Sequence, residues 1–250
     1  MLRLFQRQPP PPPVAALDVA HGGETFRVAL KRMASSRRFT LRVRAATRDV
    51  VLTMPARGSA KAAREFAERH AAWIGAGLAR LPRPVPFAPG ATIPFRGVDH
   101  VIAHRPLARG VVWTEIGAQG PQICVAGAES FLARRVADFL KREARKALEE
   151  AANRHARALG VAPRRVALRD TTSRWGSCSS SGGLNFSWRL ILAPPYVLDY
   201  LAAHEVAHCR HMDHSAAFWR VTRQLFPETD RAEAWLGAHG SKLHRFGAAA

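Results

Sequence analysis

Five consecutive residues in the last fifth of the chain, HEVAH at 204–208, have the types and spacing of a metal-dependent hydrolase. Residues four apart lie on one face of a helix, so His204 and His208 can direct two imidazoles at one point, with Glu205 beside it. A catalytic Zn²⁺ takes three protein ligands and one water molecule, whose pKa it lowers to about 7. A neighbouring carboxylate can accept the proton of that water. The motif therefore predicts two zinc ligands, His204 and His208, and a general base, Glu205.

A third ligand must come from a later part of the chain, and His214 is the candidate that we favour. It follows His208 by six residues, which gives the HExxHxxxxxH spacing of several zinc peptidase groups. The helix would have to end and turn to bring His214 back to the site. Asp213 could form that turn, because aspartate tolerates the left-handed backbone conformation.

Two other residues compete with His214 for this role. Glu228 has the HExxH-x19-Glu spacing of thermolysin-like enzymes, but it follows Pro227 and is therefore expected at the start of a helix. His211 lies on the helix face of His204, but about 10 Å further along the axis, too far to share one metal ion with it. We rank Glu228 second and His211 last.

The stretch around the motif, residues 174–219, resembles the YgjP-like metallopeptidase family, which is related to the WLM and SprT-type zinc proteases. The segments RWGSC, NFSWRL, HEVAH and HMDHSAAFW occur in the order that this family shows. The resemblance implies a zincin-like metallopeptidase domain with one Zn²⁺ per chain. It also implies that His204, His208 and His214 bind this zinc and that Glu205 acts as general base in cleaving a peptide or protein substrate.

A Gly/Ser-rich hairpin over residues 174–192 directly precedes the motif. An edge strand near a metal can pair with an extended substrate through backbone hydrogen bonds. On this basis Arg174, Trp175 and Asn185 are candidate substrate contacts. A purely structural hairpin explains the same residues equally well.

The chain is strongly basic, with 38 Lys and Arg against 19 Asp and Glu and a formal net charge of +19. Such a charge favours nucleic acid, an anionic membrane surface or an acidic substrate as partner, although an arginine-rich proteome explains it equally well. In the predicted strand RRFTLRVRA, arginines alternate with apolar residues. Arg42 and Arg44 are therefore candidate nucleic-acid contacts, but no aromatic residues interleave with them for base stacking.

These observations leave two other functions open, one from another class and one that combines both. The chain could be a nucleic-acid-binding protein with a mainly structural zinc, or a protease acting on DNA-bound proteins, as the resemblance to SprT-type proteases implies. A structural zinc site closes the fourth ligand position, whereas three ligands with a carboxylate beside them leave it open for water. This difference favours the hydrolase.

The predicted architecture is α+β, with a β-rich N-terminal region followed by the zincin-like domain. We expect a disordered proline-rich tail over residues 1–16, a β-rich region with one helix over 17–125, and the metallopeptidase domain over 126–250. A proline-rich segment at 81–90 indicates a linker, and residues 129–159 one long amphipathic helix. No segment approaches the length of a membrane span, and three scattered cysteines favour a reducing cytoplasm. No pattern indicates an oligomeric state.

Overall fold

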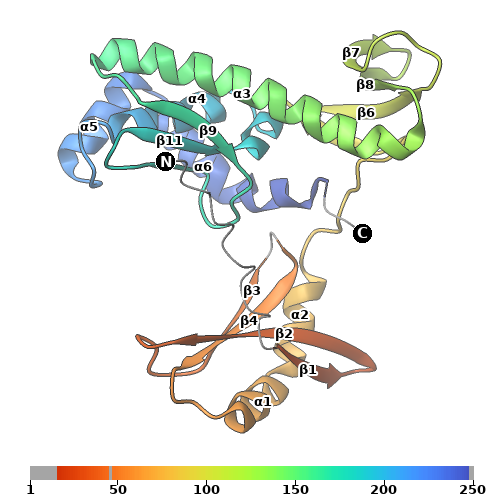
Figure 1. Ribbon diagram of the computed structural model, residues 1–250, viewed down its shortest axis with the longest axis vertical. Coiled ribbons are helices and arrows are strands. Elements are labelled where there is room, and N and C mark those ends of the chain that lie inside the picture. Colours follow the sequence, from red (N-terminus) through yellow and green to blue (C-terminus); the bar gives the residue numbers. More distant parts are fainter. Residues whose placement is uncertain (1–15, 45–46, 248–250) are drawn as a thin grey trace, which may run out of the picture. The chain divides into compact units, whose positions relative to one another are not determined.

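The computed structural model describes residues 16–44 and 47–247. The predicted proline-rich tail thus lies outside the described residues, apart from Ala16, which begins the first strand. The chain divides into two compact units, Met1–Leu81 and Pro82–Ala250, and each has a hydrophobic core of its own. The fold is mixed α+β, as predicted (Figure 1).

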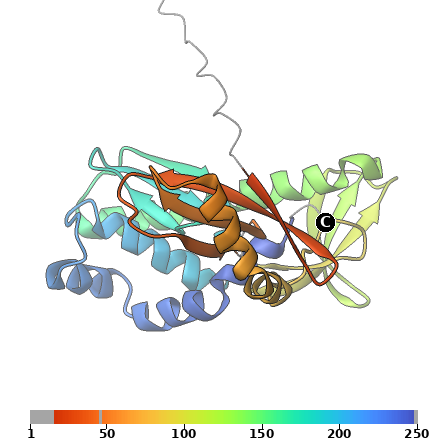
Figure 2. The ribbon, with the colours of Figure 1, turned by 90° about the horizontal axis from the view of Figure 1, so that it is seen from below.

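The first unit is a four-stranded sheet with two helices on one face (Figures 1 and 2). Its strand order is β1-β2-β4-β3, with β2 and β4 parallel and the other neighbours antiparallel. The elements are β1 (Ala16–His21), β2 (Glu24–Met33), β3 (Thr40–Arg44), β4 (Asp49–Pro55), α1 (Ala60–Arg69) and α2 (Ala71–Ala79). Alternate residues of the strands pack against the helices because successive side chains of a strand point to opposite faces.

The single helix expected in this region is two helices, α1 and α2, which meet at His70. Ser59 caps the first, its hydroxyl accepting a hydrogen bond from the Ala62 N–H at 3.0 Å. The backbone of His70 leaves the helical conformation, with φ −108° and ψ 13°, and its ring nitrogen Nδ1 lies 2.8 Å from the Phe66 carbonyl oxygen. The buried residues keep helical spacing across this break, from Ala63 and Ala67 to Ala71 and Ile74, which is why the sequence alone does not reveal it.

The second unit contains two further sheets. One has the order β5-β6-β8-β7 and the other β10-β11-β9, in which β11 pairs parallel with β9 and antiparallel with β10. The strands are β5 (Thr92–Phe95), β6 (Val98–Arg105), β7 (Val112–Gly117), β8 (Gly120–Ala126), β9 (Arg165–Arg169), β10 (Gly176–Cys178) and β11 (Gly183–Ser187). The short strand β10 is thus an edge strand.

One long helix, α3 (Leu132–Leu159), extends along the second unit from β7 and β8 to β9 and α4 (Figure 1). It matches the amphipathic helix expected over 129–159, with its first three residues in a 3-10 turn, η1 (Glu129–Phe131). Gly160 ends it in the left-handed conformation, φ +68°. The other helical segments are η2 (Trp188–Leu192), α4 (Pro195–Ala207), α5 (Ala216–Leu225), α6 (Thr229–His239) and η3 (Gly240–Arg245).

The division between the units falls after Leu81, at the start of the predicted linker, and not between residues 125 and 126. Residues on both sides of the expected boundary, Ile123 and Val125 in β8 and Leu132 and Val136 in α3, are fully buried in one core. A strand and a helix that share a core cannot belong to separate domains. Among the described residues, no helix is long and apolar enough to cross a membrane.

Three polar contacts join parts of the second unit that are distant in sequence. His155 of α3 lies with its Nε2 2.6 Å from the Asp199 Oδ1 of α4. The buried Arg189 donates to Asp170 at 2.7 Å and to the Phe246 carbonyl at 2.6 Å, so that the C-terminal segment is fixed against η2. Of these contacts, the one between His155 and Asp199 joins α4 directly to α3.

Candidate metal centre

Helix α4 carries the first part of the HEVAH motif and is buried on nearly all sides. Pro195 occupies its first turn, where proline is favoured because its missing N–H needs no partner. The helix ends at Ala207, and His208 is its C-terminal capping residue. The chain then tightens into a turn, in which the Cys209 N–H donates to the Val206 carbonyl and the Arg210 N–H to the Ala207 carbonyl, each three residues back and at 3.0 Å. The helix therefore does not continue to His211, and a later residue can return to the site.

The residue that returns is His214. One ring nitrogen each of His204, His208 and His214 lies within 4.8 Å of the other two. The Nε2 atoms of His204 and His214 are 3.3 Å apart. Glu228 and the His211 ring lie outside this group: Glu228 caps α6 and pairs with Arg231. Of the three candidates for a third ligand, the structure brings His214 alone to the other two histidines.

The loop after α4 and the start of α5 hold His214 in place. The Asp213 carboxylate accepts a hydrogen bond from the Ser215 N–H at 3.3 Å, and the Ser215 hydroxyl caps α5 by accepting from the Phe218 N–H at 3.4 Å. The fully buried Phe218 then packs against all three histidines, with ring centroids 4.4 to 4.9 Å from theirs. The second helix of the site thus supplies the packing that brings the rings together.

The ring nitrogens of His204 and His208 have defined partners on the side away from the group. His208 Nδ1 lies 2.9 Å from the His211 carbonyl oxygen, which can only accept, so Nδ1 is protonated and Nε2 keeps its lone pair. His204 Nδ1 lies 3.2 Å from the Tyr200 hydroxyl. Burial, followed by repulsion from the neighbouring histidines, lowers the pKa of His204 to about 4. A neutral imidazole with a free lone pair is the form that binds a metal, so these residues fit a metal ion.

Glu205 is 4% exposed and its Oε2 has no hydrogen-bond partner among the residues that the structure describes. Burial raises the pKa of Glu205 to about 8, and the positive charge of Arg174 opposes this only partly. The backbone of β10 passes directly beside the carboxylate: a Cβ atom at Gly176 would lie 2.4 Å from Glu205 Oε1. A buried, unpaired carboxylate is costly to maintain and is characteristic of functional sites.

A hollow of about 250 Å³ lies over the histidines and Glu205. The edge strand β10 contributes Gly176, Ser177 and Cys178 to its lining, together with Arg174 just before the strand. Opposite them, Met212 joins the three histidines in the lining. The hollow is thus bordered by a sheet edge on one side and by the end of α4 with its following loop on the other.

The three residues predicted to contact substrate have different surroundings. Arg174 is exposed and lines the hollow. Trp175 instead stacks on His244, with ring centroids 5.0 Å apart, and Asn185 of β11 accepts a hydrogen bond from Arg169 at 3.3 Å. The predicted second strand of the hairpin also ends early, at Ser187, because residues 188–192 form the 3-10 helix η2.

Sequence reasoning missed Tyr200 and Glu233. Tyr200 lies one helical turn before His204, so its position next to that histidine follows from the spacing of four residues. Its hydroxyl also donates to Glu233 Oε1 of α6 at 3.0 Å. Burial, followed by the negative charge of Glu233, raises the pKa of Tyr200 well above its usual range. No local pattern marks Glu233, because α6 reaches Tyr200 only through the tertiary fold.

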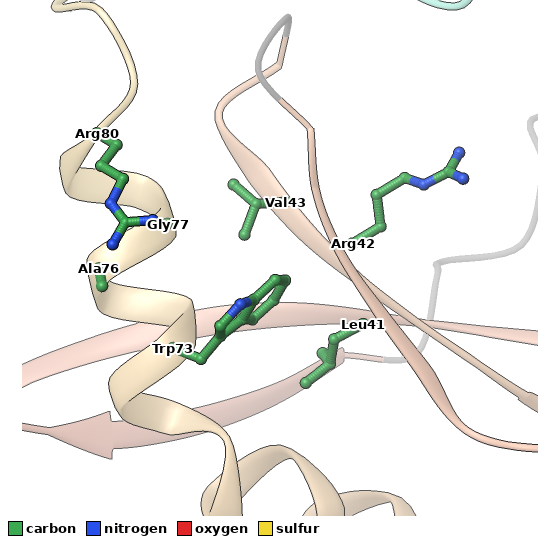
Figure 3. Close-up of a pocket in the computed structure, with 7 residues that line it drawn as sticks. All are labelled: Leu41, Arg42, Val43, Trp73, Ala76, Gly77 and Arg80. Carbon is green, nitrogen blue, oxygen red and sulfur yellow. The ribbon is translucent and has the colours of Figure 1, made fainter.

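The residues predicted to contact nucleic acid, Arg42 and Arg44, lie on β3 of the first unit. Arg44 is engaged by Asp49, whose Oδ1 accepts from its Nε at 2.6 Å, whereas Arg42 is exposed and has no ion pair among the described residues. A hollow of about 330 Å³ beside β3 exposes an aromatic ring, Trp73, which is 51% accessible. Figure 3 shows Leu41 and Val43 on the side of Trp73 and the Arg42 side chain pointing away from it. The aromatic ring and the free guanidinium are therefore on opposite faces of the strand.

Comparison with known proteins gives one family match and one structural match. Residues 37–239 match the family described as YgjP-like, metallopeptidase domain. The crystal structure of the metallopeptidase zymogen abylysin of Pyrococcus abyssi is similar over 40% of this chain and 99% of that chain, with 23% sequence identity and a TM-score of 0.34. No match was found among curated proteins.

Proposed function

We propose, from the premise that this chain belongs to the YgjP-like metallopeptidase family, that it hydrolyses peptide bonds in a peptide or protein substrate at the three-histidine site. The observation that carries the proposal is the convergence of His204, His208 and His214 beside the buried, unpaired carboxylate of Glu205. A set of ligands and a proton acceptor in one hollow is what metal-assisted hydrolysis requires.

His204, His208 and His214 would hold one zinc ion. Three neutral imidazoles are typical zinc ligands, and a set of three leaves a fourth position open, which distinguishes catalytic sites from structural ones. When bound, zinc supplies Lewis acidity, which lowers the pKa of water and polarises a carbonyl group. The open position argues against a purely structural zinc in a nucleic-acid-binding protein.

Glu205 would accept the proton of the attacking water and transfer it to the leaving amine. In the metal-free protein, burial raises the pKa of Glu205 to about 8. The positive charge of a zinc ion held beside it would lower this pKa and favour the ionised carboxylate, which is the form that accepts a proton. The unpaired Oε2 leaves one carboxylate oxygen able to accept a proton without first breaking a hydrogen bond in the protein. Burial also excludes the bulk water that would weaken this interaction.

The edge strand β10 would orient the substrate. Edge strands have unpaired backbone N–H and C=O groups, and an extended peptide can add to them as a further strand. Because Gly176, Ser177 and Cys178 line the hollow, a peptide paired with β10 would pass over the histidines. Arg174 at the rim would favour a carbonyl or carboxylate group on the substrate.

Metal content and peptide hydrolysis test the proposal. We expect about one zinc per chain in the wild type by mass spectrometry, loss of zinc in His214→Ala, and retention in Glu228→Ala. Glu205→Gln should keep the metal but lose hydrolysis of a mixed peptide library. Zinc loss in Glu228→Ala instead would overturn the ligand assignment, and full activity in Glu205→Gln would overturn the assignment of the base.

The free guanidinium of Arg42 favours one second candidate, a nucleic-acid contact in the first unit. Arg42 is exposed and unpaired among the described residues, in a chain whose net charge is +19. Such a contact would act through phosphate groups, since the Arg42 side chain points away from the exposed ring of Trp73 (Figure 3). A nucleic-acid contact at Arg42, together with the hydrolytic site, would direct proteolysis to proteins bound to DNA. Absence of DNA binding at low salt would contradict this candidate.

A further inference from the structure

We propose that Tyr200 and Glu233 form a hydrogen-bonded relay that fixes the orientation and the tautomer of His204, which makes Tyr200 a positioning residue for the metal site. The inference rests on the proposed function in one respect, since it takes His204 as a metal ligand. The relay itself is a property of the protein without any metal. It can therefore be tested on its own.

The three groups of the relay come from two helices. Tyr200 and His204 lie one turn apart on α4, and the Tyr200 hydroxyl oxygen is 3.2 Å from His204 Nδ1. Glu233 projects from α6, and its Oε1 is 3.0 Å from the same hydroxyl oxygen. Tyr200 is only 3% exposed, and Phe226 packs on its ring. The hydroxyl is thus enclosed, with two defined partners.

The number of protons determines the direction of each hydrogen bond. A phenol has one proton, and the carboxylate of Glu233 can only accept, so the Tyr200 hydroxyl donates to Glu233. The Tyr200 oxygen can then only accept, and His204 Nδ1 must be the atom that carries the proton. In a neutral imidazole the other nitrogen, Nε2, keeps the lone pair, and this is the atom 3.3 Å from His214 Nε2.

His208 adopts the same tautomer, but its hydrogen-bond acceptor is different. Its Nδ1 donates to the His211 backbone carbonyl, so the lone pair of its Nε2 is also available to a metal ion between the three histidines. His204 and His208 thus both present Nε2 as ligand before any metal is bound. The His208 acceptor is a backbone atom that mutation cannot remove, whereas the His204 acceptor is a side chain. Tyr200 is therefore the position at which this arrangement can be tested.

Glu233 acts on the His204 tautomer by accepting a hydrogen bond from the Tyr200 hydroxyl. Its side chain is exposed, so that solvent screens its charge. Without an acceptor at position 233, the Tyr200 proton is free to turn toward His204 Nδ1 and would favour the opposite tautomer. Glu233→Gln keeps an acceptor oxygen at the same place and should preserve the relay, while Glu233→Ala should not.

The first test measures the tautomer without metal. In ¹⁵N-labelled, zinc-free protein, long-range ¹H–¹⁵N spectra distinguish a protonated Nδ1 from a protonated Nε2. We expect protonated Nδ1 for His204 in the wild type and in Glu233→Gln, and a mixture of tautomers in Tyr200→Phe and Glu233→Ala. A protonated Nε2 in the wild type, or an unchanged His204 spectrum in Tyr200→Phe, would overturn the relay.

The second test measures zinc affinity by competition with a chromogenic chelator. Loss of a group that orients a metal ligand weakens affinity about 10- to 100-fold, so we expect about a tenfold weaker Kd in Tyr200→Phe. Tyr196→Phe is the matched control, because it removes the same atom from the chain's other tyrosine, one turn earlier on α4. Adding Glu233→Ala to Tyr200→Phe should weaken binding no further, since Glu233 acts only through the hydroxyl.

The two tests distinguish failure of the relay from failure of the proposed function. Equal zinc affinity in wild type, Tyr200→Phe and Tyr196→Phe would overturn the positioning role while leaving the metal site in place. A wild type that shows the expected tautomer but binds no zinc would contradict the proposed function and still support the relay. Thermal unfolding of the zinc-free variants checks that a change in affinity does not come from partial unfolding.

Discussion

Replacing Gly176 by alanine should slow peptide hydrolysis strongly while leaving His204, His208 and His214 in place. A Cβ atom at this position would lie 2.4 Å from Glu205 Oε1, 2.7 Å from its Cγ and 2.8 Å from its Cδ. Rotation about the Cγ–Cδ bond would move the carboxylate oxygens alone, and rotation about Cβ–Cγ would leave the contact with Cγ, so only a change of rotamer about Cα–Cβ moves all three atoms away. Glu205 is also buried, so its side chain cannot move out into solvent.

The expected loss of activity follows from how far the Glu205 carboxylate and the added Cβ atom must move apart. Ordinary contact begins at 3.4 Å, so the carboxylate or β10 must move by about 1 Å from the present 2.4 Å. A misplacement of about 1 Å can cost a factor of about 100 in rate, which corresponds to about 2.7 kcal/mol of transition-state stabilisation. Overpacking of this kind costs about 1–3 kcal/mol in the free energy of unfolding.

The assay compares kcat/KM for peptide hydrolysis, zinc content and thermal unfolding in Gly176→Ala and a matched control. Gly237→Ala is that control, because a Cβ atom there meets nothing within 4 Å and the residue lies in α6. We expect the control to be as active as the wild type and slightly more stable, by about 0.5–1 kcal/mol. If Gly176→Ala retains both zinc and wild-type kcat/KM, the close approach of β10 to Glu205 is not needed for catalysis, and our reasoning about the base is wrong.

Three further predictions concern packing, pH and charge. Phe218→Ala should lower the free energy of unfolding by about 3–5 kcal/mol and also weaken zinc binding, because Phe218 packs against the histidines. Leu148→Ala, at an equally buried position, should lower the free energy of unfolding by about 2–5 kcal/mol without changing the zinc affinity of the folded protein. Denaturant unfolding measures the stability and chelator competition the zinc affinity. Burial alone would raise the pKa of Asp170, but the Arg189 guanidinium more than compensates, and the net pKa lies below the usual 3.8. This carboxylate therefore stabilises the fold above about pH 4, and its contribution is lost as the pH falls through its folded pKa. Urea unfolding should therefore show Asp170→Asn to be less stable than the wild type at pH 7, by at most about 1 kcal/mol because the group is half exposed, and this difference should shrink at pH 3. In DNA binding at low salt, Arg42→Ala should reduce affinity and the salt dependence more than Arg44→Ala, since Asp49 already engages Arg44; equal effects would contradict this.

The sequence predicted the parts of the site that depend on local spacing. His204 and His208 share a face because they lie four residues apart, and the structure brings His214 to them after α4 ends at Ala207. Their roles as ligands stay a prediction. The α+β class and the long helix α3 were also readable from alternation and periodicity.

What the sequence could not supply depends on contacts between distant residues. Glu233 meets Tyr200 across 33 positions, and Gly176 meets Glu205 across a strand–helix contact that no local pattern marks. The run WRLIL at 188–192 was expected to continue a strand, but all five residues are buried and no alternation separates a strand from another buried segment. The domain boundary was misplaced for a related reason, since a change from strand to helix at residue 126 does not indicate whether the two share a core.

The separate hydrophobic cores of the two units have a consequence for calorimetry. All three histidines of the metal centre belong to the unit that begins at Pro82, and a ligand that binds only the folded state stabilises it by RT ln(1 + [L]/Kd). At a free zinc concentration of 100 times Kd this amounts to about 2.7 kcal/mol, all of it assigned to one of two cooperative melting events. A heating scan should therefore contain one peak that shifts upward with zinc and one that stays at the same temperature, and the stationary peak would report the sheet that carries Arg42.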